Sequence, residues 1–404
     1  MAHSSSRIDM SRSAVLAHIG AHGPTPRAQL ARVLDLSPAM ITQITKRLIS
    51  EKLLVELENA PSSIGRPAQA LGLAHDAPHA IGVKVAPDHV TCVEVKLDGS
   101  VARESTQDFD TAGPTALESL TSMLREFIQQ GGDQPLLGIG VGIPGDVHVQ
   151  SEGVVDSTQL GWERLPLGET LRRELQLPVL IDNNVNALAH AETLYGAGRD
   201  RRNILIVTIG TGIGAGIVNN GSVMRGDSGS AGEIGHIPTI TDGPLCQCGA
   251  HGCLEAIVGE KALVTRARER GIISTTDGIG ALHVAAHSSR PGARALFEEA
   301  GHLLGRTVAG LVNTIDPSLV VVLGEGVESW QHWSVGFEPS FRAGLIPRKR
   351  GTGVAVERWQ DDRWAQGAAC LVLATPFDED GISGEQGRLV RARLLEATEA
   401  VTTT

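Results

Sequence analysis

The stretch GEIGHIPTITDGPLCQCGAHGCLE, residues 232–255, contains three of the five cysteines of a 404-residue chain. These are Cys246, Cys248 and Cys253, and His236 lies shortly before them. Thiolates grouped this closely, together with an imidazole, are typical of a tetrahedral zinc site with three cysteine ligands and one histidine ligand. The stretch therefore predicts a structural Zn2+ site.

Glycines and carboxylates in the same stretch bear on this prediction. Gly249 and Gly252 allow the tight turns that would direct the cysteines at one ion. Buried free thiols are the alternative interpretation, and a disulfide is a further one, although nothing marks the chain as secreted. Glu233 and Glu255 bracket the metal ligands, so carboxylates fixed beside a closed zinc site could serve a ligand.

The composition indicates a globular protein of about two or three domains. Hydrophobic residues make up 41% and charged residues 20% of the chain. No apolar run approaches the ~20 residues of a membrane-spanning helix, and the initial MAHSSSRIDMSRS lacks the apolar centre of a signal peptide. We therefore expect a cytoplasmic protein that has no membrane partner and whose thiols stay reduced.

The charge is unevenly distributed along the chain. The net charge is −11, yet residues 1–75 hold eight Lys and Arg against five Asp and Glu. The remaining residues hold 27 basic and 41 acidic side chains. A mildly basic N-terminal part on an acidic body predicts that only the N-terminal part meets a polyanion such as DNA.

The N-terminal part shows three short helical periods. Thr25-Pro26 and Ser37-Pro38 each provide a helix cap followed by a proline suited to the first helical position. In the third period, Ile41, Ile44 and Leu48 form the apolar stripe. The opposite face of this expected helix carries the candidate DNA-contacting residues Ala39, Thr42, Gln43, Lys46 and Arg47.

The next segment, LLVELENAPSSIGRPAQALGL (residues 53–73), has the pattern strand, polar turn, strand, with Arg66 at the turn. Two capped helices followed by such a hairpin predict a winged helix-turn-helix in which the second helix reads DNA and Arg66 contacts a minor groove or a phosphate. A generic three-helix bundle with a solvated charged face is the alternative. We assign residues 1–75 to this domain.

From about residue 80, strand and helix patterns alternate, which predicts an α/β architecture. LLGIGVGIPG (136–145) is a buried strand entering a glycine turn, and NILIVTIGTGIGAGIV (203–218) gives two strands around Thr211. Backbone N–H groups of that turn could bind an anion, although such a turn is as often a simple hairpin.

Five segments together resemble the ROK family of repressors and sugar kinases, over residues 80–375. They are GIPG at 142–145, DNNVNALAHAE at 182–192, IGTGIGAGI at 209–217, AGEIGHI at 231–237 and CQCGAHGCLE at 246–255. The resemblance implies a two-lobed actin/hexokinase-like ATPase fold after the winged helix. We expect the first lobe over 79–195, rejoined by the C-terminal helix after about 365, and the second lobe with its zinc site over 196–364.

The resemblance also implies roles for individual residues. The zinc ligands would be His236, Cys246, Cys248 and Cys253. The sugar pocket would be lined by Asn183, Asn184, Glu233, His236 and Glu255, so that His236 serves both the metal and a hydroxyl.

Three departures from the kinase pattern bear on activity. The segment Lys84–Asp88 corresponds to the kinases' phosphate turn of pattern Asp-x-Gly-Gly-Thr, but it begins with Lys84 in place of the Asp and has neither glycine. Asn184 stands where they have a catalytic Asp, and an amide cannot accept the proton of a sugar hydroxyl at neutral pH. Glu325 stands where the family usually has glycine beside the adenosine. No catalytic residue and no bound ATP are therefore expected.

The sequence thus predicts a sugar-responsive transcriptional regulator, most simply a repressor of carbohydrate uptake or catabolism genes. Its partners would be a double-stranded DNA operator, a sugar or sugar-phosphate effector, and a second copy of the chain in a homodimer or tetramer. The alternatives are an ATP-dependent sugar kinase with an added DNA-binding head, and an interaction scaffold that has lost sugar binding.

Overall fold

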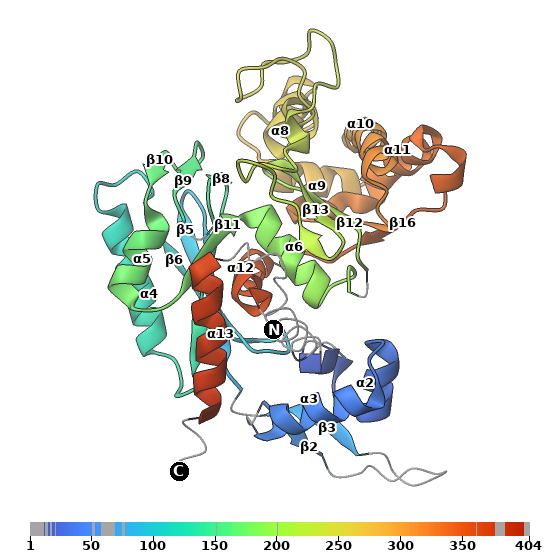
Figure 1. Cartoon of the computed structure of the whole chain (residues 1–404). Helices are drawn as coiled ribbons and strands as arrows, with labels where there is room; N and C mark the ends of the chain where they lie inside the picture. Colours follow the sequence, from blue (N-terminus) through green and yellow to red (C-terminus); the bar gives the residue numbers. More distant parts are fainter. Residues whose placement is uncertain are drawn as a thin grey trace. The chain divides into compact units, whose positions relative to one another are not determined.

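The chain forms two compact units in the computed structural model (Figure 1). Unit 1 comprises Met1–Gly196 and Asp362–Thr404, and unit 2 comprises Ala197–Asp361. The structure describes residues 12, 15–16, 18–20, 22–50, 53–57, 69–74, 77–150, 152–199, 201–360, 362–375 and 384–399. Among these residues, no helix combines the length and apolar character needed to cross a bilayer.

The N-terminal part of unit 1, hereafter the head, has the predicted helix and hairpin order. Its sheet has the strand order β1-β3-β2, and both pairings are antiparallel. Ile41, Ile44 and Leu48 are buried in its core, as the apolar stripe predicts, and Leu30 of the preceding helix is buried with them. The elements are β1 (Thr25–Pro26), α2 (Arg27–Val33), α3 (Pro38–Ser50), β2 (Leu54–Glu56) and β3 (Ala70–Leu73).

One of the two predicted helix caps is confirmed and the other is wrong. The Ser37 side chain accepts a hydrogen bond from the Met40 backbone N–H at 3.2 Å, which caps α3. Thr25 and Pro26 instead form strand β1, and the Thr25 hydroxyl donates to the Gly23 carbonyl. The strand pairing with β3 satisfies the backbone of this segment, so α2 begins one residue later than the pattern predicts.

The body of unit 1 is a five-stranded mixed sheet of order β11-β7-β4-β5-β6. Helices α4 and α5 cover one face, and α12 covers the other (Figure 1). The central strands β4 and β7 consist mainly of apolar residues and glycine because both of their faces are buried. The elements are β4 (His79–Val85), β5 (His89–Val95), β6 (Val101–Asp108), α4 (Ala116–Gln129), β7 (Leu136–Ile143), α5 (Leu167–Leu175), β11 (Val179–Asn183), α6 (Asn184–Leu194), α12 (Arg363–Leu373) and α13 (Gly384–Glu399).

Two strand glycines allow α12 to lie directly on this sheet. A Cβ atom on Gly140 would be 1.7 Å from the Ala368 carbonyl oxygen, and one on Gly82 would be 1.9 Å from that of Ala365. The C-terminal part of the chain therefore completes the core of unit 1.

Unit 2 contains a second five-stranded mixed sheet, of order β14-β13-β12-β15-β16. Helices α10 and α11 pack closely because a Cβ atom on Gly301 would be 2.0 Å from the Trp333 carbonyl oxygen. The elements are β12 (Ile204–Ile209), β13 (Ile213–Asn219), β14 (Ser222–Val223), η1 (Ile234–His236), α7 (Glu255–Val258), α8 (Glu260–Glu269), α9 (Ile279–His287), α10 (Pro291–Ile315), β15 (Leu319–Leu323), η2 (Glu325–Ser329), α11 (Trp330–Gly344), η3 (Pro347–Lys349) and β16 (Gly353–Val356).

Candidate functional site

The cysteine-rich segment of unit 2, residues 238–253, folds back on itself into a compact loop, hereafter the cysteine knuckle. Isolated β-bridges join Pro238 to Cys253 and Leu245 to His251. Gly252 has φ +73°, and a Cβ atom there would be 1.8 Å from the Ile240 carbonyl oxygen. Glycine is therefore required at this turn, which brings the last cysteine back toward the first two.

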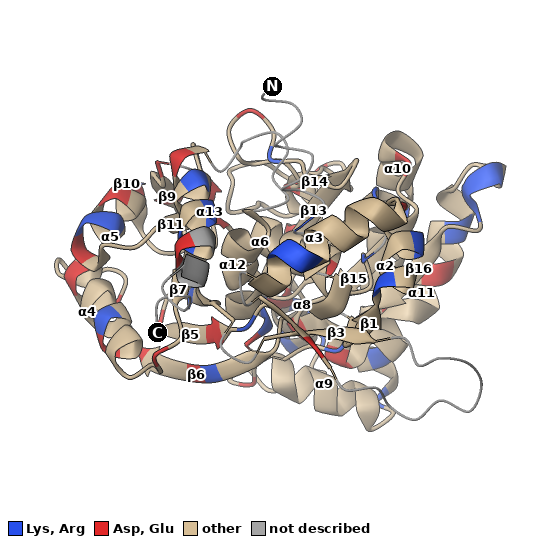
Figure 2. Cartoon of the chain, turned by 60° about the horizontal axis from the view of Figure 1, so that its bottom comes forward, with Lys and Arg blue, Asp and Glu red and all other residues tan. Residues whose placement is uncertain are grey.

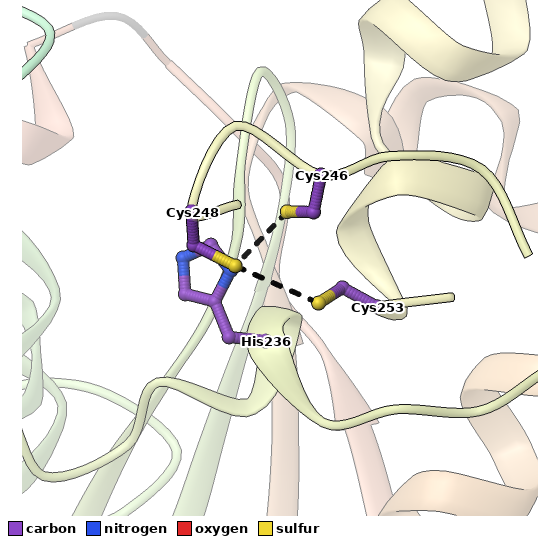
Figure 3. Close-up of side chains that lie close together, drawn as sticks. All are labelled: His236, Cys246, Cys248 and Cys253. Carbon is purple, nitrogen blue, oxygen red and sulfur yellow. Dashed lines mark hydrogen bonds between the residues drawn. The ribbon is translucent and has the colours of Figure 1, made fainter. Parts of the chain in front are cut away.

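The four predicted metal ligands converge, as Figure 3 shows. Their ligand atoms all lie within 4.8 Å of one another. Cys248 Sγ is 3.7 Å from Cys253 Sγ, and Cys246 Sγ is 3.5 Å from His236 Nδ1. Tetrahedral zinc with ordinary bond lengths requires edges of about 3.8 Å between two sulfurs and about 3.6 Å between sulfur and nitrogen. The cluster is therefore compatible with a zinc ion.

Within this cluster, Cys253 is buried whereas Cys248 is exposed. Burial, together with the sulfurs of Cys248 and Cys246, raises the pKa of Cys253 to about 12. A hydrogen bond from the Ala250 backbone lowers the pKa of the exposed Cys248 thiol. Neighbouring thiolates repel one another, and a divalent cation among them would remove that repulsion.

The His236 imidazole has one nitrogen for the cysteine cluster and one for a neighbouring carboxylate. Its Nδ1 faces Cys246, whereas its Nε2 lies 3.8 Å from Glu233 Oε2. His236 is the last residue of the short helix η1. Just before this helix, the Gly232 backbone lies close to the Ala215 carbonyl, and this contact holds the start of η1 in place. The ring can therefore bind a metal while its other nitrogen takes part in a polar contact.

The Glu255 carboxylate is held from two sides. Its Oε2 accepts a hydrogen bond of 3.0 Å from the Ile213 backbone N–H. Its Oε1 accepts one of 2.8 Å from Gln247 Nε2. Gln247 lies between two of the cysteines in sequence, and no role was predicted for it. Only its position inside the Cys246–Cys248 pair could have drawn attention to it.

The glycine turn at the end of β12 is in contact with an acidic side chain. A Cβ atom on Gly210 would lie 2.2 Å from Glu325 Oε2, so that the carboxylate rests on the turn. Burial, and secondarily the charge of Glu325, raises the pKa of nearby Glu260. The turn that the sequence suggested as an anion site therefore has a carboxylate against it.

In unit 1, the predicted ligand residues lie where β11 meets α6. The Asn183 side chain caps α6 by accepting from the Val185 N–H at 2.8 Å, and its amide donates to the Gly145 carbonyl at 2.9 Å. Asn184 follows as the first residue of α6. The buried Asp182 carboxylate accepts hydrogen bonds from Gln150 and Asn186. Asn183 thus has a structural role whether or not it also binds a ligand.

Residues 84–88, where the resemblance implied a departure from the kinase pattern, lead through a tight hairpin from β4 into β5. The Ala86 N–H donates to the His89 carbonyl at 2.9 Å. The Asp88 carboxylate bonds His89 Nδ1 at 2.7 Å, and this hydrogen bond lowers the pKa of Asp88. The hairpin residues therefore pair with one another.

The predicted DNA-contacting face is exposed on α3, where Figure 2 shows basic residues in blue. The Arg27 guanidinium of α2 links α3 to β2, because it donates hydrogen bonds to the Thr45 hydroxyl of α3 and to the Glu56 carboxylate of β2. Arg66 lies outside the described residues. The exposed set on α3 is Ala39, Thr42, Gln43, Lys46 and Arg47.

Comparison with known proteins assigns the chain to one family. The ROK family pattern matches residues 80–375, and the chain belongs to the ROK family. Its likeness extends over the head to regulators of that family. It is 30% identical over 373 residues to the DNA-binding transcriptional dual regulator NagC of Escherichia coli (strain K12), covering 90% of this chain and 92% of that protein.

Solved structures show the same relationship. The crystal structure of a ROK family transcriptional regulator, a homologue of the E. coli MLC protein, matches with TM-score 0.78 and 25% identity, over 96% of this chain and 99% of that one. A ROK family glucokinase from Streptomyces griseus, in complex with glucose and AMPPNP, matches with TM-score 0.64 and 26% identity, over 72% of this chain and 98% of that one.

Proposed function

We propose that this chain is a sugar-responsive transcriptional repressor that has lost sugar kinase activity. The observation that carries the proposal is the extent of the two structural matches. The regulator matches 96% of this chain, head included, whereas the glucokinase matches only 72% although nearly all of the glucokinase is covered. The segment that distinguishes them includes a winged helix-turn-helix, which is a DNA-binding module.

The proposal assigns zinc to His236, Cys246, Cys248 and Cys253. A zinc ion there would have a structural role, because four protein ligands leave no open coordination position for substrate or water. The distances within the cluster support zinc over a disulfide, since a disulfide requires sulfurs about 2.05 Å apart. Reduced thiols at such a site fit a cytoplasmic protein.

The proposal assigns sugar hydroxyls to Glu233, His236 and Glu255 of unit 2, and to Asn183 and Asn184 of unit 1. Carboxylates, imidazole and amides are the groups that hydrogen-bond hydroxyls. In support, Glu255 and His236 are each fixed by contacts to the cysteine knuckle or its neighbours. Fixed polar groups bind a ligand at a lower entropic cost than mobile ones.

Loss of kinase activity is supported by chemistry in both units. Asn184 cannot act as a general base. In unit 2, the Glu325 carboxylate on Gly210 would repel the phosphates of a nucleotide at that turn. The second candidate function, an ATP-dependent kinase, is supported by the match to the glucokinase but requires a different proton acceptor.

The proposal assigns DNA contacts to the exposed face of α3, and to Arg66. Thr42 and Gln43 can read base edges, while Lys46 and Arg47 can neutralise phosphates. Palindromic half-sites require two heads at a fixed spacing, so we propose that the working form is a homodimer.

The decisive experiment combines sugar binding, DNA binding and ATP turnover on one preparation. Thermal-shift screening with d-glucose, d-xylose, N-acetyl-d-glucosamine and their 6- or 5-phosphates should give at least one ligand that raises Tm. A duplex selected by the chain from a random DNA library should then bind with an affinity that this ligand changes. ATP consumption with any of these sugars, without selective DNA binding, would establish the kinase instead. If the chain bound neither a sugar nor DNA, the interaction scaffold would be the remaining function.

A further inference from the structure

The β5–β6 turn, residues 97–100, is contacted in unit 1 by the residue that follows α6. Tyr195, the one tyrosine of the chain, donates a hydrogen bond of 3.0 Å from its hydroxyl to the Leu97 carbonyl. Its ring lies against Gly99, where a Cβ atom would be only 2.7 Å from the ring. Gln366 of α12 donates to the Gly99 carbonyl at 2.6 Å. The turn is thus fixed to both helices.

The same turn also contacts the N-terminal segment of the head. A Cβ atom on Gly20 would be 2.7 Å from the Leu97 carbonyl oxygen and 2.9 Å from Asp98 Cα. Ile19 is buried in a hydrophobic cluster that also contains Val95, and Leu97 and Tyr195 pack against that cluster. One carbonyl oxygen, that of Leu97, therefore lies close to both the tyrosine hydroxyl and the head.

Helix α6 connects this contact to the proposed sugar-binding residues of unit 1. Asn184 is its first residue, and Tyr195 follows its last. The helix packs closely on α12, since a Cβ atom on Gly367 would be 3.0 Å from Leu188 Cα. A displacement at the Asn184 end would therefore be carried along this helix to Tyr195. The chain leaves unit 1 directly afterwards, at Gly196.

We propose that Tyr195, through its hydrogen bond to Leu97, is the positioning residue that transmits the ligand state of α6 to the head. The proposal rests on the proposed function, because it needs a sugar that acts on α6 and a head that binds DNA. Breaking the tyrosine contact leaves Gln366 as the remaining helix contact of the β5–β6 turn, and it thereby loosens the surface on which Gly20 lies. Sugar binding and DNA binding would each persist without the hydroxyl, but they would be less strongly coupled.

The test uses Tyr195→Phe, which removes the hydroxyl and keeps the ring, with Thr193→Val as the matched control. Thr193 also loses a hydroxyl from α6, but that hydroxyl bonds only carbonyls of its own helix among the described residues. The response is the ratio of DNA Kd with and without the sugar that gives the largest thermal shift, measured by fluorescence anisotropy on the selected duplex. We expect Tyr195→Phe to reduce this ratio about fivefold, with the sugar Kd from calorimetry unchanged and Thr193→Val like the wild type.

Hydrogen exchange on the full chain provides a readout that requires neither ligand. In Tyr195→Phe, amides of residues 97–100 and 18–23 should exchange faster, whereas those of α3 should not change. A second variant, Gly20→Ala, should produce the same loss of response by disturbing the head's own contact with the turn, and Gly310→Ala, which has open space around it on α10, serves as its control.

The outcomes separate this proposal from the proposed function. A wild-type chain whose DNA affinity responds to no sugar would refute the proposed function, and the present proposal with it. A full wild-type response retained by Tyr195→Phe, or unchanged exchange at residues 18–23, would refute the role of Tyr195 alone.

Discussion

Glu255 shows how strongly the chemistry of one carboxylate depends on its immediate neighbours. Its two oxygens are taken by a backbone N–H of β13 and by the Gln247 amide, which belongs to the cysteine knuckle. Its own backbone opens α7, two residues after Cys253. Any change in the knuckle therefore reaches the carboxylate by two routes, one through the main chain and one through Gln247.

Replacing Gln247 with Leu should weaken sugar binding without loss of zinc. Leu removes the amide that orients Glu255 Oε1, and the lost hydrogen bond is worth about 1 kcal/mol, or about fivefold in Kd. Calorimetry with the best sugar and zinc analysis by mass spectrometry measure the two effects. Cys248→Ser is the comparison, since it removes a proposed zinc ligand. Equal sugar affinity in Gln247→Leu and wild type would show that Gln247 does not position Glu255.

At the residue scale, the sequence predicts which side chains can bind a metal better than it predicts which side chains contact one another in the fold. The spacing of the cysteines is sufficient to predict a metal-ligand set, because few other arrangements make use of three thiols and an imidazole. The contact between Gln247 and Glu255, and that between Glu325 and Gly210, join residues whose proximity depends on tertiary packing. Periodicity and motif spacing contain no information about such pairs.

Among the secondary-structure elements, β7 and α12 illustrate a packing requirement that is invisible in hydrophobic patterns. Gly140→Ala should destabilise unit 1 by more than about 3 kcal/mol, because the new methyl group would overlap the Ala368 carbonyl and force the helix off the sheet. Gly142→Ala, on the same strand, is the matched control, since its Cβ atom would lie an ordinary 3.5 Å from the Ala368 Cβ. Urea denaturation distinguishes them, and similar midpoints would contradict the proposed overlap.

Helix α9 and η2 are joined by a buried histidine. His283 Nδ1 bonds the Ser329 hydroxyl, and its ring stacks on Phe297 with centroids 5.5 Å apart. Burial lowers the pKa of His283. The charge of Glu328 raises this pKa, whereas the neighbouring His287 and His332 lower it further. The folded state thus binds a proton less readily than the unfolded chain does.

This histidine should make the stability of unit 2 depend on pH. Below about pH 6.5 the unfolded chain takes up a proton that folded His283 resists, so its contribution decreases as the pH falls. His283→Gln should therefore cost about 1–2 kcal/mol at pH 7.5 and less at pH 5.5. Thermal unfolding across this range tests it, with His302→Gln, an exposed residue of α10, as control. A difference between variant and wild type that does not vary with pH would contradict the expectation.

In the head, two helices followed by a hairpin could be predicted from sequence, but the start of the first of these helices could not. Ser37-Pro38 begins α3 as expected, whereas Thr25-Pro26 forms an edge of the head's sheet. The two dipeptides have equivalent local chemistry. They differ only in that Ala70 and Leu71 of β3 pair with the latter, and this partner lies more than 40 residues along the chain. Pairing with a distant strand overrides a local capping preference.

On the scale of the whole molecule, charge separates the head from the body. The body is acidic and the head mildly basic, so that a polyanion approaching the chain is attracted only by the head.

Lys46→Ala should therefore weaken binding to all duplexes and reduce the slope of log K against log salt by about one. Lys261→Ala, the same charge change on exposed α8, should leave that slope unaltered. Equal slopes for both variants would remove α3 from the phosphate interface. Arg66→Ala can be measured in the same assay.

The alternating strands and helices, with the family motifs, are sufficient to predict the α/β class and the ROK fold. The association of the head with the first sheet in unit 1 could not be predicted in the same way. The contact between Gly20 and Leu97 depends on a turn in another domain of the predicted scheme, and the residues concerned have no pattern in common.

The position of α12 also has a consequence for biosynthesis. The helix that covers β4 and β7 comes from residues 363–373, whereas the strands themselves begin at residue 79. During translation, the sheet of unit 1 must wait on the ribosome with one apolar face uncovered while all of unit 2 is synthesised. A message truncated before residue 362 would yield a complete winged helix on an unfinished sheet, which is a target for proteases and chaperones. Incomplete chains would therefore be removed before they could occupy an operator.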